Sequence, residues 1–197
     1  MNQSFQIQFD SRSLRDALGE FATGVAVVTA SGIDGQPVGV TINSFAAVSL
    51  EPPLVLWSLG LASPSRASFE SCSHYAVNIL AADQVEFSQR FSQPQEDRFA
   101  GIDLEVGAGG TPLLPGCSAW FECRNEARYP GGDHVILVGY VENFRRESKA
   151  PLIFHGGRYR ELADPPAAPS RWIPSDPPGR TYPARGYRPR ILRGHKK

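Results

Sequence analysis

The stretch Val38–Ser58, which reads VGVTINSFAAVSLEPPLVLWS, decides the fold. Apolar residues at positions 38, 40 and 42 alternate with small or polar ones, which is the period-two pattern of a strand with one buried face. Two more strands are predicted over 46–50 and 54–57, with a turn at 51–53. Small hydroxyls and an amide interrupt these otherwise buried strands. Because burying an unpaired hydroxyl or amide costs on the order of 1–3 kcal/mol, we expect a polar ligand against them.

The rest of the chain predicts a mainly β, antiparallel domain with peripheral helices. Tyr129-Pro130-Gly131-Gly132-Asp133 is a hairpin turn between two long apolar runs. About eight strands and few helices favour a closed or partly closed barrel. The further strands are expected over 25–29, 74–80, 119–128, 134–145, 152–154 and 158–162, the helices over 64–71 and 83–91, and mostly loop over 95–116.

One more helix is predicted near the start of the chain, over 11–21. Leu14, Leu18 and Phe21 recur at helical spacing, and Asp10 or Ser11 is available as the N-cap. This amphipathic pattern predicts a helix that lies on the barrel, with the strand 25–29 following it. That strand is expected to pair antiparallel with 38–43.

Composition bounds the class of protein. A length of 197 residues with 41% apolar and 20% charged residues suits one globular domain. No apolar run approaches the roughly 18 residues of a spanning helix, and the first residues lack a signal-peptide pattern, so we expect a cytoplasmic protein without membrane contact. Cys72, Cys117 and Cys123 are odd in number and lack metal-type spacing. We therefore expect reduced structural thiols and no metal site.

Common nucleotide and hydrolase signatures are absent from the sequence. Gly107-Ala108-Gly109 starts like a dinucleotide fingerprint, but Pro112 stands at the third glycine position and no helical pattern follows. There is no GxxxxGK[ST], HExxH or GxSxG motif.

Five separated motifs, in order, resemble the flavin reductase family, which has the FMN-binding split-barrel fold. The motifs are GVTINSFAAVSLEPPLVLWSL, SPSRASFESCSHYAVNIL, FSQRF with DRFAG, GGDHVILVGYV and PLIFHGGRY, within residues 14–162. The resemblance implies a homodimer with FMN near the subunit interface. It also implies that NADH or NADPH reduces FMN, or FAD, and that a separate flavin-dependent monooxygenase receives the reduced flavin.

The resemblance also implies a set of site residues. Hydroxyls, an amide and backbone groups near the end of strand 38–43 suit the polar edge of an isoalloxazine ring, and a phosphate needs hydroxyls and a cation. The expected flavin-ring and ribityl residues are Thr41, Ile42, Asn43, Ser44, Phe45, Ser58 and Leu59; the phosphate residues are Ser63, Ser65, Arg66, Ser88 and Arg90; and His134, with His155 and Tyr159, is expected near the nicotinamide. The reaction needs no protein acid or base, because hydride passes from the nicotinamide to the flavin.

The last 34 residues differ in character from the domain, which we assign to residues 1–163. Residues 164–197 carry eight Lys or Arg against Asp164 and Asp176, a net charge of +6, and are rich in proline. We expect an extended or disordered basic tail, and we expect its deletion from residue 165 to leave flavin reduction intact. The tail leaves one alternative open, a nucleic-acid or partner-binding module, although a solvated tail without nucleic acid is favoured. A second alternative is a flavin carrier or sensor without NAD(P)H turnover.

Overall fold

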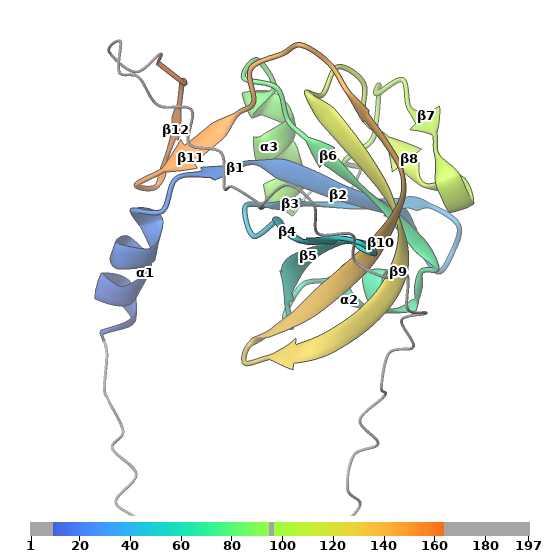
Figure 1. The fold of residues 1–197 in the computed structure, drawn as a ribbon, viewed down its shortest axis with the longest axis horizontal. Helices are drawn as coiled ribbons and strands as arrows, with labels where there is room; N and C mark the ends of the chain where they lie inside the picture. The colour runs from blue at the N-terminus through green and yellow to red at the C-terminus, as the bar shows by residue number, and fades with distance from the viewer. Residues whose placement is uncertain (1–9, 95–96, 164–197) are drawn as a thin grey trace, which may run out of the picture.

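The computed structural model describes residues 10–94 and 97–163, which form a curled antiparallel sheet of seven strands with helices around it (Figure 1). The strand order is β3-β2-β6-β9-β10-β5-β4. Strands β3 and β4 end this order and do not pair with each other, so the barrel is split. The predicted split antiparallel fold is confirmed. The bounds are β2 (Ala26–Ser31), β3 (Pro37–Ile42), β4 (Ala46–Leu50), β5 (Pro53–Gly60), β6 (His74–Ile79), β9 (Ala119–Gly131) and β10 (His134–Arg146).

The predicted strand pairs are present. Strands β2 and β3 are antiparallel, with Val28 opposite Val40. The long hairpin of β9 and β10 turns at Gly132, whose φ of +73° favours glycine. By contrast β4, which the sequence predicted to be part of a buried pair, is an edge strand whose residues are mostly exposed, including Val48 and Leu50. Its apolar content alone did not reveal which strand lies at the edge.

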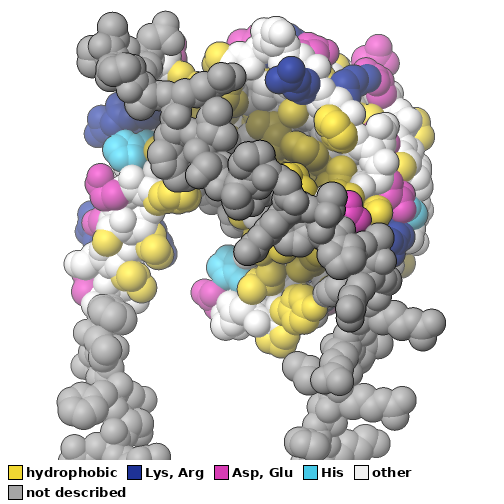
Figure 2. All heavy atoms as spheres, viewed as in Figure 1, with side chains coloured by type: hydrophobic (Ala, Val, Ile, Leu, Met, Phe, Trp, Pro, Cys, Tyr) yellow, Lys and Arg dark blue, Asp and Glu magenta, His cyan; other side chains and the backbone are white. Residues whose placement is uncertain are grey.

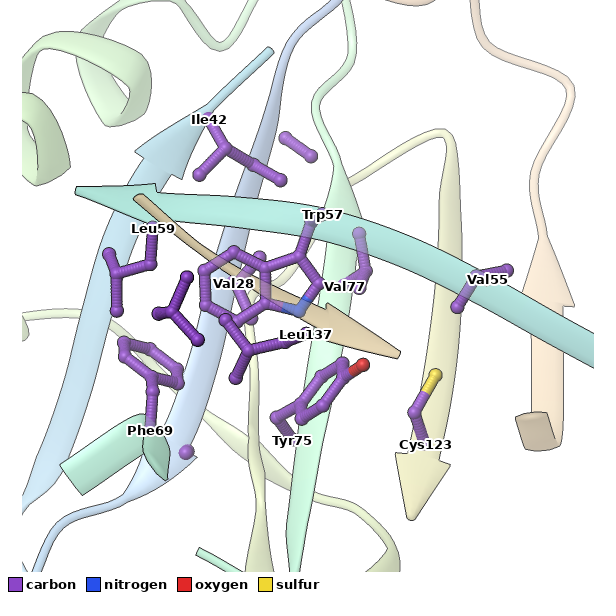
Figure 3. Packing of buried hydrophobic residues seen from close by; sticks show 13 residues of the cluster. Val28, Ile42, Val55, Trp57, Leu59, Phe69, Tyr75, Val77, Cys123 and Leu137 are labelled. Atoms are coloured by element: carbon purple, nitrogen blue, oxygen red, sulfur yellow. The ribbon is translucent and has the colours of Figure 1, made fainter. Parts of the chain in front are cut away.

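The core inside the curled sheet is centred on Trp57 (Figure 3). Its ring makes edge-to-face contacts with Phe69 at 5.1 Å and with Tyr75 at 5.6 Å between centroids. Val28 and Leu137, from strands far apart in sequence, complete the same cluster. A second cluster, which includes Phe91, Phe99, Trp120 and Leu114, lies on the other side of the sheet.

Two short helices cover the body. Helix α2 (Arg66–Ser71) follows β5, and α3 (Val85–Ser92) packs on β3, so the helices predicted over 64–71 and 83–91 are confirmed with later starts. The region predicted as mostly loop also contains β7 (Glu105–Val106), the 3-10 turn η1 (Ala108–Gly110) and β8 (Pro112–Leu113). These elements are too short to leave a hydrophobic period in the sequence.

A separate unit, which we call the arm, stands beside the body (Figure 1). It consists of α1 (Ser11–Gly19), β1 (Thr23–Gly24), β11 (Ile153–His155) and β12 (Arg158–Arg160), and its three strands form a sheet of their own. Asp10 caps α1 by accepting hydrogen bonds from the backbone N–H groups of Arg12 and Ser13.

The prediction that this helix lies on the barrel is wrong. Helix α1 has no buried residue, and Leu14, Leu18 and Phe21 are 43%, 68% and 79% exposed. Figure 2 shows hydrophobic side chains on the arm beside the open space between arm and body. The periodicity identified an apolar helix face that packs against another surface, but it did not show which surface that is.

The three cysteines are free, as predicted. Burial raises the pKa of Cys117 and of Cys123 to about 12, so both stay protonated at neutral pH. In the described ranges, no helix has the length and apolar content needed to cross a membrane.

Candidate functional site

A cavity of about 280 Å³ lies between the end of β3 and helix α3, and we call it the β3–α3 cavity. It brings together five of the predicted residues, although they come from three distant parts of the chain. Its lining consists of Val25, Thr41, Ile42, Asn43, Ser88, Ser92, Phe154 and Tyr159.

Two hydrogen bonds fix the geometry of this cavity. The Thr41 hydroxyl donates to the Ser88 carbonyl oxygen at 2.7 Å, which ties β3 to α3. The Ser88 hydroxyl lies 2.9 Å from the Tyr159 hydroxyl, which ties α3 to β12 of the arm. The Tyr159 ring in turn meets Phe154 edge-to-face at 5.7 Å. Three elements therefore hold one another in register around the cavity.

Asn43 stands where this cavity meets a second one. The neighbouring cavity, of about 580 Å³, lies between β3 and the arm and shares Asn43 and Phe154 with the first. The Asn43 side chain is exposed, and its amide forms no hydrogen bond with the residues that the structure describes. An exposed, unengaged amide at the junction of two cavities is available to a ligand.

Ser44 joins the end of β3 to β5. Its hydroxyl accepts a hydrogen bond from the Ser58 N–H at 3.0 Å and lies 3.2 Å from the Ser58 carbonyl oxygen. Phe45 stacks on Phe121 at 5.4 Å and packs against the core. Leu59 was expected beside the flavin, but its side chain is 2% exposed and belongs to the core, so only its backbone is available.

The free edge of β3 borders a cavity of about 690 Å³, which we call the edge cavity. Ser65 and Ser68 line it together with Arg98, whose guanidinium donates to the Gly39 carbonyl at 2.8 Å. The Arg98 Nε is buried and has no partner among the described residues. Asp34 lies at the same cavity with Asp97, and each accepts a local backbone N–H.

Two arginines predicted for a phosphate do not reach the edge cavity. Arg66 forms a salt bridge with Glu70 at 2.9 Å and lines a different cavity. Arg90 donates a hydrogen bond to the carbonyl oxygen of Ala100 and lines a third cavity, next to α3. Ser63 belongs to the turn after β5, where its N–H bonds to the Gly60 carbonyl.

The two predicted histidines lie on different units. His134 begins β10, opposite Gly60 of β5, and its Nδ1 is 2.6 Å from a carboxylate oxygen of Asp133. This contact holds the pKa of Asp133 below its usual value. His155 is in β11 of the arm, 3.5 Å from Glu20. Neither histidine lines the β3–α3 cavity.

Sequence reasoning missed Arg98 and Phe154 as cavity residues. Both lie inside motifs that carried the family resemblance, DRFAG and PLIFHGGRY. A motif match shows that a residue belongs to the pattern. The match does not say which neighbouring side chain faces a cavity, because that depends on the packing.

The comparisons with known proteins concern the family of this chain. The family model described as "Flavin reductase like domain" matches residues 18–163. The chain is 45% identical over 151 residues to a probable flavin reductase of Rhizobium meliloti, covering 77% of this chain and 49% of that protein. It is 46% identical over 150 residues to FMN reductase (NADH) SmoA of Agrobacterium fabrum, and this match covers 76% of this chain and 85% of that protein.

A third relative is the reductase component of a flavin-dependent trigonelline monooxygenase from Acinetobacter baylyi, 46% identical over 148 residues, covering 75% of this chain and 48% of that protein. The chain thus spans about half the length of two of these relatives. Among solved structures, NADH:FAD oxidoreductase SgcE6 of Streptomyces globisporus, in complex with NAD and FAD fragments, has a TM-score of 0.74 and 38% identity and covers 78% of this chain and 93% of that one. This chain belongs to the flavin reductase family.

Proposed function

We propose that this chain is an NAD(P)H:flavin oxidoreductase, in which hydride passes from NADH or NADPH to FMN, or to FAD. The observation that carries the proposal is the β3–α3 cavity. Its lining combines the polar side chains of Thr41, Asn43, Ser88 and Tyr159 with apolar side chains. The relatives named as flavin reductases support the activity. When bound, the flavin supplies the acceptor for the hydride, and the protein supplies binding, orientation and electrostatics.

The flavin ring is assigned to the end of β3. Asn43 offers its free amide to the polar edge of the ring, and Val25 and Phe154 offer apolar surface to its faces. The Ser88 hydroxyl is held by Tyr159, so it is positioned before a ligand arrives. Such preorganised donors stabilise charge that develops on the ring without reorganising during the reaction.

The flavin phosphate is assigned to the edge cavity. Asn43, directly after β3, is four residues beyond Gly39, which spans about 13 Å at a rise of ~3.3 Å per residue. A ribityl chain can therefore follow the free edge of β3 from Asn43 toward Ser65 and Arg98. We assign to Arg98 the phosphate-binding role that was predicted for Arg66, since a guanidinium binds phosphate through several N–H groups. Asp34 and Asp97 also line the edge cavity, and each carboxylate accepts a hydrogen bond from a backbone N–H two residues further along the chain.

A flavin-dependent monooxygenase is proposed as the recipient of the reduced flavin. The support is the relative named as the reductase component of such an enzyme. The β3–α3 cavity and the cavity between β3 and the arm share Asn43 and Phe154 in their linings, and two adjoining cavities of this kind suit a flavin that enters and leaves.

A homodimer is proposed from the arm. The apolar side chains of α1 are exposed in one chain, and a patch of this kind beside a ligand cavity favours burial by a second copy. Leu18→Glu is expected to shift the mass measured by light scattering from dimer to monomer, because it buries a charge in the contact. Ile33→Glu changes an equally exposed residue outside the arm and is expected to leave a dimer. A monomeric wild type, or a dimeric Leu18→Glu protein, would refute the arm interface.

Anaerobic stopped-flow absorbance with excess FMN tests the activity. Bleaching of the flavin band over many flavin equivalents after adding NADH or NADPH is the expected result, and the faster nicotinamide identifies the donor. The competing hypothesis is a flavin carrier or sensor. Tight FMN binding with no bleaching by either nucleotide would support that hypothesis and reject the reductase.

A further inference from the structure

Backbone hydrogen bonds anchor the arm to the body at its root. The N–H of Val25, directly after β1, donates to the carbonyl oxygen of Leu152, directly before β11, at 3.0 Å. Leu80, directly after β6, bonds to both of them. Its N–H donates to the Val25 carbonyl oxygen at 3.0 Å, and its carbonyl oxygen accepts from the Leu152 N–H at 2.8 Å. The arm therefore leaves the body from one fixed place next to the end of β6.

Beyond this root, helix α1 and the hairpin of β11 and β12 form one unit (Figure 1). The N–H of Gly156, in the turn of the hairpin, donates to the carbonyl oxygen of Gly19 at the end of α1, at 2.9 Å. His155 of β11 is 3.5 Å from the carboxylate of Glu20, which follows α1. A change in the position of the hairpin therefore moves the helix with it.

Among the described residues, one side-chain hydrogen bond joins this unit to the body. It lies between Tyr159 of β12 and Ser88 of α3, whose hydroxyl oxygens are 2.9 Å apart. Ser88 is only 2% exposed. Because its hydroxyl is buried, loss of the Tyr159 hydroxyl leaves a polar group without this partner, which is costly.

Ser88 also belongs to the proposed flavin site. Its backbone carbonyl oxygen accepts a hydrogen bond from the Thr41 hydroxyl at 2.7 Å, and both residues line the β3–α3 cavity. Phe154, which is opposite Tyr159 in the β11–β12 pair, lines the same cavity from the arm. A ligand in this cavity therefore borders residues on both sides of the Ser88–Tyr159 hydrogen bond.

We infer that the Ser88–Tyr159 hydrogen bond couples flavin binding to the position of the arm, with Tyr159 as a positioning residue. The inference rests on the proposed flavin site and goes beyond it, because it gives the arm a role in retaining the flavin. A ligand that contacts Ser88 and Phe154 together favours the arm position in which both face one cavity. By linkage, holding the arm in that position raises the affinity for the ligand by the same factor.

A double-mutant cycle tests the coupling. Tyr159→Phe and Ser88→Ala each remove one partner of the hydrogen bond. Each is expected to raise the Kd for FMN about tenfold in a fluorescence titration, and the double variant is expected to bind FMN no more weakly than Ser88→Ala alone. Tyr140→Phe is the control, because it removes a hydroxyl from β10 and keeps the ring that Arg124 covers at 5.0 Å. It is expected to leave the Kd unchanged.

Two results of this cycle would overturn the inference. One is an unchanged Kd in Tyr159→Phe. The other is a double variant in which the two losses multiply, because the hydroxyls would then act independently of each other.

Hydrogen exchange gives a readout that a merely structural role of Tyr159 would not change. In the wild type, saturating FMN is expected to slow exchange of the β11 and β12 amides about tenfold. In Tyr159→Phe, saturating FMN is expected to slow exchange in β3 and α3 but not in the arm. Equal slowing of the arm in both proteins, or an arm that FMN does not affect in the wild type, would contradict the coupling.

The same experiments separate this inference from the proposed activity. A wild type that binds FMN and shows the coupling but never bleaches it with NADH or NADPH would reject the reductase function alone. A wild type that binds no FMN would reject both.

Discussion

Replacing Trp57 with alanine is expected to lower the free energy of unfolding by about 3–5 kcal/mol, as is usual for removal of a large aromatic side chain from a core. Trp57 has no exposed surface and, with Trp120, is among the largest of the fully buried side chains. It contacts Phe69 and Tyr75, so its loss opens a cavity bordered by rings that cannot collapse into it (Figure 3). Urea unfolding followed by far-UV circular dichroism measures the change.

Trp57→Phe is the matched control. The indole Nε1 is buried and has no hydrogen-bond partner among the described residues, so phenylalanine removes volume but also an unsatisfied polar group. We expect a loss of about 1–2 kcal/mol, well below that of alanine. An alanine variant as stable as the phenylalanine variant would show that the ring is not a principal support of the core.

Gly39→Val is expected to destabilise the protein by about 1–3 kcal/mol and to weaken FMN binding at least about tenfold. A Cβ at Gly39 would lie 2.7 Å from the Phe91 ring and 3.0 Å from Phe99, both buried. The added side chain must push α3 away from β3. Since α3 carries Ser88, the shift breaks the contact with Thr41 and opens the β3–α3 cavity. Fluorescence titration of FMN and urea unfolding measure the two effects.

Gly24→Ala provides the comparison for Gly39. No atom lies within 4 Å of a Cβ at Gly24, and its φ is not in the left-handed region. This variant is expected to match the wild type in stability and in FMN affinity. If Gly39→Val kept its FMN affinity after losing stability, the position of α3 would not control the flavin site.

The strands could be predicted from the sequence because their pattern is local. Val38, Val40 and Ile42 alternate within one strand, and Gly132 sits at a turn between two long apolar runs. The pair Thr41 and Asn43, which we propose to line the flavin site, followed from the motif at the end of this strand. Each of these features needs only a few consecutive residues.

The rest could not be predicted because it depends on contacts between distant residues. The 11–21 pattern predicted a helix, but its exposed position depends on the arm, which pairs β1 with β11 near the end of the domain. The sequence predicted Arg66 for the phosphate and assigned no role to Arg98. Only the packing shows that Arg66 turns to Glu70 while Arg98 turns to Gly39.

The most direct test of the central claim is a crystal structure of the protein with FMN. The account predicts the polar edge of the isoalloxazine ring within about 3 Å of Asn43 or the backbone near Ser44, as hydrogen bonding requires, and the phosphate beside Ser65 and Arg98. Flavin bound elsewhere, with the β3–α3 cavity empty, would contradict it.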